Sequence, residues 1–212
     1  MRKTKFANGE YYHIYNRGTD KRDVFLDEYD YARFLRSLEE FNRIEPIGSL
    51  YIKDQLSERG VAAGPLQEER LVEIIAFCLN PNHFHLILKQ EKEGGVSEFM
   101  KRVSGGYTGH FNFRYKRTGV LFQGKFKAIH IDSNEYLLYL SAYVNGNNLV
   151  HDTKTFRSSL GNYLKNKKDN LCNPEIILSQ FQNREGYKDF VANNAVAIKE
   201  KREGIKQYLL EE

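Results

Sequence analysis

The hydrophobic positions of the chain begin with strand-like and then helix-like spacing. Aromatic and β-branched residues run from residue 11 to residue 16 and stop at the turn signal Arg17-Gly18, which predicts a first strand. Apolar residues then recur at i, i+3, i+4 and i+7, namely Tyr31, Phe34, Leu35 and Leu38. This spacing predicts a helix over about residues 27–43.

The middle of the chain is more strongly apolar. The run LVEIIAFCL at residues 71–79 is typical of a buried strand, and Asn80-Pro81-Asn82 is a turn before a second strand, HFHLILK, at residues 83–89. Together they predict a central hairpin. Helical spacing returns over about residues 96–115, although Gly105-Gly106 weakens the middle of that helix.

Residues 119–131 predict a further strand, and Asp132 or Ser133 can cap a third helix over about residues 134–145. The resulting order, β, α, β, β, α, β, α, predicts an α+β fold of the ferredoxin-like (RRM-like) type, an antiparallel sheet with helices on one face. Residues 45–70 interrupt the pattern with glycines and prolines and read as a loop or small insertion. We therefore expect a catalytic domain over residues 1–151 and a C-terminal helical extension over residues 152–212.

Charge is distributed unevenly along the chain. The net charge of the 212 residues is only +4, which by itself points weakly to a polyanionic partner. Between residues 99 and 131, however, there is no Asp or Glu, and the basic residues are Lys101, Arg102, Arg114, Lys116, Arg117, Lys125 and Lys127. A surface built from this stretch would be strongly positive and suited to nucleic acid.

Cysteine usage and hydropathy bound the cellular setting. Cys78 and Cys172 are far apart and form no CxxC pair, so we expect no disulfide framework and a reducing, cytoplasmic environment. The first residues have no apolar core of the secretory type, and no run approaches the ~20 apolar residues of a membrane span. We expect no membrane partner.

The tripeptide His83-Phe84-His85 lies on a predicted strand, where residues two apart share a face. His83 and His85 then project together, while Phe84 and Leu86 point into the core. Two imidazoles on a rigid strand can grip a metal ion. The alternatives are a solvent-facing pair or half of a structural zinc site, and no Cys or further His stands nearby in sequence to complete the latter.

The predicted third helix carries a stripe of tyrosines. Tyr136, Tyr139 and Tyr143 stand at i, i+3 and i+7, and Asn147 follows Tyr143 by four residues, on the same face if the helix continues past Gly146. Such a stripe either supplies a catalytic phenol or is the packed side of an amphipathic helix.

The segment RTGVLFQGKFKAIHI, residues 117–131, alternates apolar residues with Lys and Gln. It follows a basic helix that also carries aromatic side chains: Tyr107, Phe111, Phe113 and Tyr115. The combination could follow a phosphate backbone and stack bases, or it could be a half-buried strand with a solvated basic face.

Three motifs in this order resemble a known family. LNPNHFHLIL resembles the HUH motif of single-tyrosine transposases, in which two histidines hold a divalent metal. YHIYNRGTDKRDVF and GVLFQGKFKAIHIDSNEYLLYLSAYV resemble the opening and downstream blocks of REP-associated tyrosine transposases. The similarity spans about residues 11–151. The family usually has Asn-Pro shortly after the tyrosine, where this chain has Asn147-Asn148.

The resemblance implies roles for particular residues. His83, His85 and Asn147 would be ligands of a divalent metal, Mg²⁺ or Mn²⁺, and Tyr143 would be the nucleophile. The DNA-binding residues would be Arg17, Lys101, Arg102, Arg114, Lys116, Arg117, Gln123, Lys125 and Lys127.

The function implied is that of a transposase, a metal-dependent endonuclease and strand transferase acting through a 5′-phosphotyrosine. The expected partner is single-stranded DNA with a hairpin, and monomer and homodimer both stay open. Two other functions stay open as well: a domesticated DNA or RNA hairpin-binding protein without cleavage activity, and a metal-dependent hydrolase that uses water. The RNA-binding RRM domains share the ferredoxin-like scaffold, but no run here resembles their aromatic consensus.

Overall fold

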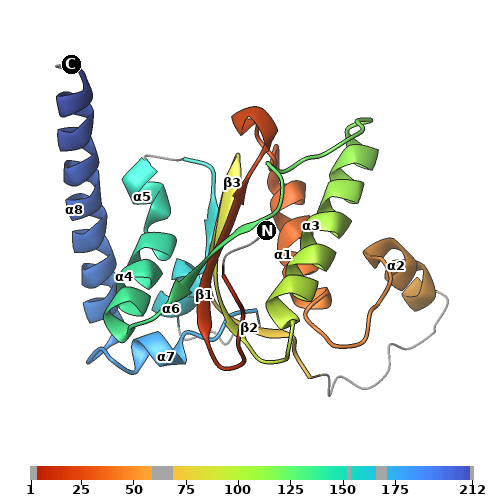
Figure 1. Ribbon diagram of the computed structural model, residues 1–212, viewed down its shortest axis with the longest axis horizontal. Coiled ribbons are helices and arrows are strands. Elements are labelled where there is room, and N and C mark those ends of the chain that lie inside the picture. Colours follow the sequence, from red (N-terminus) through yellow and green to blue (C-terminus); the bar gives the residue numbers. More distant parts are fainter. Residues whose placement is uncertain (1–3, 59–68, 152–153, 166–170, 211–212) are drawn as a thin grey trace.

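The computed structural model of the protein describes residues 4–58, 69–151, 154–165 and 171–210. Its centre is a five-stranded antiparallel sheet with the order β4-β1-β3-β2-β5 (Figure 1). The strands are β1 (Tyr11–Arg17), β2 (Val72–Asn80), β3 (His83–Gln90), β4 (Lys127–Ile131) and β5 (Arg157–Ser158). The expected α+β class with an antiparallel sheet is confirmed.

Helices cover both faces of this sheet. The long helices α1 (Glu28–Glu40) and α3 (Gly95–Arg114) lie on one side, and α4 (Asn134–Asn145) and α8 (Arg184–Leu210) lie on the other (Figure 1). This corrects the expectation of helices on one face only. The reason is that the strands carry buried apolar residues on their second face too, including Ile75 and Ile87, and these require a cover of their own.

An irregularity in β2 changes which of its residues face each side of the sheet. The register with β3 shifts between Ile74 and Ala76, so that Ile75 is an extra residue in the strand. Ile74 and Phe77 therefore face the core beneath α1 and α3, although they are three residues apart, while Ile75 and Cys78 face the α4 side.

The predicted central hairpin is confirmed. Asn80 pairs with His83 across the two-residue turn Pro81-Asn82. Along β3, Phe84 and Leu86 belong to the core beneath α1 and α3. Because side chains alternate along a strand, His83 and His85 point to the other face, towards α4.

The predicted long helices form close to their expected bounds. α1 begins after Asp27, whose side chain accepts a hydrogen bond from the Asp30 backbone N–H at 3.1 Å. α3 runs unbroken through Gly105-Gly106. A Cβ on Gly106 would lie 2.8 Å from a ring carbon of Phe41, so this glycine permits close packing beside α1. For α4, the cap is Ser133, which accepts from the Tyr136 N–H.

The predicted strand at residues 119–131 is only partly formed. Regular pairing begins at Lys127, and before it the chain makes a single bridge between Gly18 and Phe122. Gly119 and Gly124 have φ angles of +83° and +69°, a conformation outside the extended region that a strand needs.

The C-terminal part of the chain joins the same core. Tyr163, Ile177, Tyr187 and Val191 are buried together with the residues of β2 and α4. The remaining elements are η1 (Thr19–Lys21), α2 (Leu50–Glu58), α5 (Asn147–His151), α6 (Leu160–Leu164) and α7 (Glu175–Leu178). The expected insertion at 45–70 contains α2, and residues 59–68 of it lie outside the described residues. Within the described ranges, no helix has the length and apolar character needed to cross a membrane.

Candidate active site

A pocket of about 240 Å³ opens on the α4 side of the sheet. It lies where β1 ends and β3 begins, since Arg17 pairs with His83 and Tyr15 with His85. The side chains around it come from distant parts of the chain: Tyr15, Asn16, Arg17, His83, His85, Gln123, Lys127, Tyr143 and His151. The fold thus brings the histidine pair, one tyrosine of the α4 stripe and three of the expected DNA-binding residues together.

His85 is buried and lies against a histidine of the neighbouring strand. Its Nδ1 is 2.9 Å from Nε2 of His13, and the two rings stack with centroids 5.1 Å apart. One nitrogen of this contact must carry the proton, so the hydrogen bond couples the tautomers of the two rings. Sequence reasoning missed His13, which shares a face with Tyr15 by the two-residue alternation of β1.

His83 is held by two asparagines of the hairpin. Its Nδ1 lies 2.6 Å from the Asn82 side-chain oxygen, which can only accept, so Nδ1 carries the proton. Its Nε2 therefore has a free electron pair and accepts from Asn80 Nδ2 at 3.1 Å. The His83 and His85 rings are nearly perpendicular, at 89°, with centroids 5.1 Å apart.

Asn147 reaches the same place from the start of α5. Its side-chain oxygen accepts from Asn80 Nδ2 at 2.7 Å, so the electron pairs of Asn147 and His83 converge on one amide nitrogen. The Asn147 amide nitrogen itself is buried without a hydrogen-bond partner in the structure. Sequence reasoning treated Asn80 only as part of a turn.

No group of three or more His, Cys, Asp or Glu side chains within the described part of the chain is arranged to hold a metal ion. Any cation here would need Asn147, water or a phosphate oxygen to complete its ligands.

Burial keeps the site histidines neutral. Desolvation lowers the pKa of His13 to about 4 and that of His83 to about 4, and the positive charge of Arg17 adds to the effect on His83. Burial, followed by the neighbouring histidines, holds the pKa of His85 well below its ordinary value. At neutral pH each imidazole therefore keeps an electron pair that can bind a cation or accept a hydrogen bond.

Tyr143 is the member of the tyrosine stripe that lines the pocket. Its ring centroid lies 5.5 Å from that of His85 and 6.5 Å from that of His13. Tyr136 is half-buried against the core on the α4 side, and Tyr139 is 41% exposed. Of the three tyrosines, Tyr136 therefore packs against the core, Tyr139 faces solvent and Tyr143 lines the pocket.

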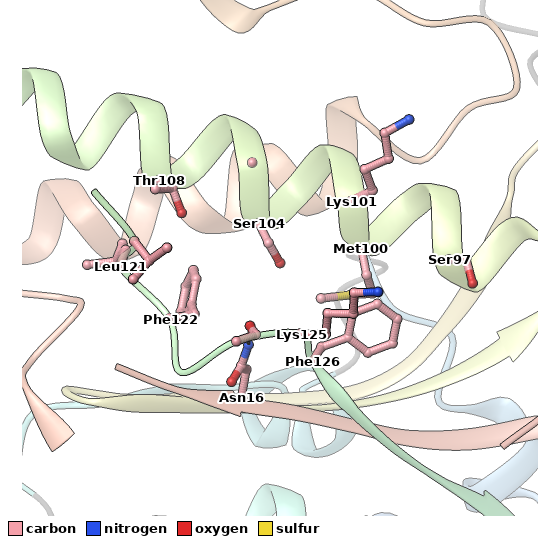
Figure 2. Close-up of a pocket in the computed structure, with 13 residues that line it drawn as sticks. Asn16, Ser97, Met100, Lys101, Ser104, Thr108, Leu121, Phe122, Lys125 and Phe126 are labelled. Carbon is pink, nitrogen blue, oxygen red and sulfur yellow. Dashed lines mark hydrogen bonds between the residues drawn. The ribbon is translucent and has the colours of Figure 1, made fainter. Parts of the chain in front are cut away.

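The expected DNA-binding residues fall into separate places. Arg17, Gln123 and Lys127 line the pocket, and Lys127 Nζ also lies 5.9 Å from the centroid of the Tyr15 ring. Lys101 and Lys125 border a different groove, beside α3 (Figure 2).

The remaining basic residues of the set lie away from both hollows. Lys116 is exposed in the turn after α3. The three arginines Arg102, Arg114 and Arg117 make internal contacts: Arg102 with the backbone oxygens of residues 43 and 44, Arg114 with Asp27 and Asp30, and Arg117 with Asn112.

His151 is a further pocket residue that the sequence did not single out. It ends α5, and its ring centroid lies 6.0 Å from that of His83. Its position in the pocket depends on the break between α4 and α5 at Gly146. The spacing of hydrophobic residues does not predict the direction of the chain after such a break.

Comparison with known proteins gives one family match, over the part of the chain that carries most of the candidate site. Residues 52–147, just under half of the chain, match the sequence model of the family described as "Transposase IS200 like". The matched region contains the histidine pair, Tyr143 and Asn147. This part of the chain is therefore similar to a transposase family, in agreement with the resemblance of its motifs.

Two solved structures are similar at low sequence identity. One is a REP-associated tyrosine transposase bound to a REP hairpin, with 14% identity, a TM-score of 0.47, and coverage of 75% of this chain and 81% of that chain. The other is a candidate transposase from Deinococcus radiodurans, with 16% identity, a TM-score of 0.36, and coverage of 68% and 95%. No curated protein matches the chain.

Proposed function

We propose that this transposase-like protein is a metal-dependent single-stranded DNA endonuclease and strand transferase that works through a 5′-phosphotyrosine at hairpin-associated sites. The observation that carries the proposal is the pocket in which the Tyr143 ring lies 5.5 Å from His85, beside the cationic side chains of Arg17 and Lys127. A phenol next to neutral imidazoles and two positive charges suits attack on a phosphodiester.

The residues present fit a divalent cation, Mg²⁺ or Mn²⁺, held by His83, His85 and Asn147. The electron pairs of His83 Nε2 and Asn147 Oδ1 converge on the amide nitrogen of Asn80, a partly positive group that a cation would replace. Water and phosphate oxygens would supply the remaining ligands that these metals prefer. When bound, such a cation withdraws charge from a non-bridging phosphate oxygen and makes the phosphorus more electrophilic.

The contact with His13 decides which nitrogen of His85 is available. If His85 Nδ1–H donates to His13 Nε2, the electron pair of His85 is on Nε2. In the other tautomer Nε2 carries the proton and cannot bind a cation. His13 is therefore a positioning residue, in the place that an outer hydrogen-bond acceptor occupies around metal-bound histidines.

In the proposed reaction, Tyr143 loses its phenolic proton to water and its oxygen attacks phosphorus. The bond from phosphorus to the 3′ oxygen breaks, and that oxygen takes up a proton to leave a 3′-hydroxyl. An unperturbed phenol has a pKa of about 10, so charge neutralisation by Arg17 and Lys127 assists the ionised form. The phosphotyrosine ester keeps the energy of the broken bond, and a second 3′-hydroxyl can reverse the step on another strand.

By the resemblance of its motifs, the substrate is single-stranded DNA beside a hairpin. With one tyrosine per pocket, each active site cuts one strand at a time. Monomer and homodimer are both compatible with this scheme.

Tyr143→Phe tests the nucleophile, with Tyr139→Phe as the matched control on the same helix. Labelled hairpin DNA with a single-stranded flank is incubated with Mn²⁺ and analysed by denaturing electrophoresis. We expect a denaturant-resistant adduct from the wild type and from Tyr139→Phe, and none from Tyr143→Phe, which still binds the hairpin.

An adduct from Tyr143→Phe would overturn the assignment of the nucleophile. Wild-type cleavage without an adduct would favour a hydrolase that uses water. Hairpin binding without cleavage would favour a binding module.

A further inference from the structure

A second groove, of about 630 Å³, lies on the opposite face of the sheet from the candidate active site. Its walls are α3 and the irregular segment at residues 120–126 (Figure 2). Figure 2 shows Ser104 and Thr108 projecting from α3 towards this segment, with Asn16 on the strand below.

One short stretch of chain separates the groove from the active-site pocket. Phe122, Lys125 and Phe126 line the groove, whereas Gln123 and Lys127 line the pocket. The side chain of Asn16 donates to the Gly124 backbone oxygen at 3.1 Å and contributes to both hollows. A DNA strand that leaves the pocket across this stretch therefore meets the groove next.

The groove combines an apolar interior with a cationic rim. Met100, Leu121 and Phe122 are buried residues that form its apolar part. Lys125 stands at its edge, and its described lining contains no Asp or Glu. Lys101 also borders the groove, but its side chain points away from it and its ammonium pairs with Glu98 at 3.3 Å (Figure 2).

A polar group inside the groove lacks a partner. The Ser104 hydroxyl oxygen is buried and makes no hydrogen bond in the structure. An apolar slot with an unused hydroxyl and a lysine at its mouth matches the parts of a nucleotide: a flat base with polar edges, joined to a phosphate.

We propose that this groove binds the base of one unpaired nucleotide in the strand adjoining the phosphate at Tyr143, with Lys125 on the backbone. The inference rests on the proposed function, which supplies the strand. The groove would then be a specificity subsite. It would contact the base through aromatic and sulfur-containing side chains, whereas the catalytic pocket would contact the phosphate.

The test is an abasic scan. Single-stranded oligonucleotides that lack one base at successive positions are titrated against the metal-free protein, and binding is followed by fluorescence anisotropy. Wild type should lose about tenfold in affinity at one position, the size expected for a lost stacking contact. Ser104→Leu, which fills the groove, should show no such position. The control Gly109→Leu should behave like wild type, because it adds the same bulk to α3 where a Cβ meets nothing within 4 Å.

Lys125→Glu gives a second, independent measurement at an exposed residue. It should weaken binding of every oligonucleotide, and more strongly than Lys188→Glu, the same charge reversal on α8. The groove does not bind a base if the affinity of the wild type is the same at every abasic position, or if Ser104→Leu keeps the position-specific loss of affinity. Adduct formation by Tyr143 would be unaffected by either result. If the wild type forms no covalent adduct but still loses affinity at one abasic position, the proposed function is wrong and the base-binding role of the groove is supported. Absence of any single-strand binding would overturn both.

Discussion

At the scale of single residues, the stacked imidazoles of His13 and His85 form one hydrogen-bonded pair beside the pocket. Their ring planes are 21° apart and their nitrogens 2.9 Å apart, so both rings are held in one orientation. Because burial favours the neutral forms, one proton is shared in this contact rather than two.

His13→Ala should weaken Mn²⁺ binding by about 10- to 100-fold, the usual effect of losing an outer hydrogen-bond partner of a metal-bound histidine. His13→Gln should restore much of the affinity, because its side-chain oxygen can accept from His85 Nδ1–H. Calorimetric titration measures the affinity, and ¹⁵N spectra of the histidine rings report the tautomer of His85.

The control is His130→Ala, which removes an exposed histidine on β4 that contacts Glu10. Equal Mn²⁺ affinity in wild type and His13→Ala, with the tautomer of His85 unchanged, would show that His13 only fills space.

At the scale of elements, α1 and α3 are joined by a buried carboxylate. Asp30 is fully buried and accepts three hydrogen bonds, from the Leu26 N–H at 2.8 Å, Arg114 at 2.8 Å and the Tyr115 hydroxyl at 2.9 Å. Arg114 also contacts Asp27, the cap of α1. A residue expected to bind DNA thus stabilises the packing of two helices.

Arg114→Ala should lower the free energy of unfolding by clearly more than the loss of an exposed ion pair does, because it leaves the Asp30 carboxylate buried without its cationic partner. Urea denaturation measures the change. Lys101→Ala removes the same charge from the same helix at an exposed i,i+3 pair, and should change stability by less than about 1 kcal/mol. If Arg114→Ala instead weakens DNA binding at unchanged stability, its role is the one inferred from sequence.

At the scale of the whole molecule, α8 fixes the end of α4, the helix that carries Tyr143. Asn145 donates to the Tyr187 hydroxyl at 2.8 Å and accepts from the Ser159 hydroxyl at 2.7 Å, so three distant segments meet beneath α4. One residue later, a Cβ on Gly146 would lie 2.9 Å from Val191 Cγ1 and 3.0 Å from the Ala142 backbone oxygen. The close approach of α8 therefore requires glycine between Tyr143 and Asn147.

Gly146→Ala should destabilise the protein by about 1–3 kcal/mol, the usual cost of overpacking, and thermal unfolding measures it. Adding Val191→Ala should recover part of the loss, because the valine methyl group is one of the two colliding atoms. Gly109→Ala, at an exposed helical position with open space around it, should be neutral or stabilising. If the destabilisation of the double variant equals the sum of the two single effects, contact with α8 is not what requires glycine at position 146.

The sequence by itself determined the elements and the local geometry of the histidine pair. Its periodicities located β1, the central hairpin and the helices α1, α3 and α4, because helical and strand spacing are local properties of the chain. The alternation of a strand also turned His83 and His85 away from Phe84, and the motifs predicted a transposase-like protein.

Only the tertiary structure decided which side chains meet. The pairing of β1 with β3 set His13 against His85, and the hairpin turned Asn80 towards both His83 and Asn147. The cover of α4 and α8 gave the sheet its second core, and ion pairs with Asp27 and Asp30 engage Arg114. Apart from the Asn80–His83 contact within the hairpin, these contacts join residues far apart in the chain, and periodicity carries no information about which strands or helices become neighbours.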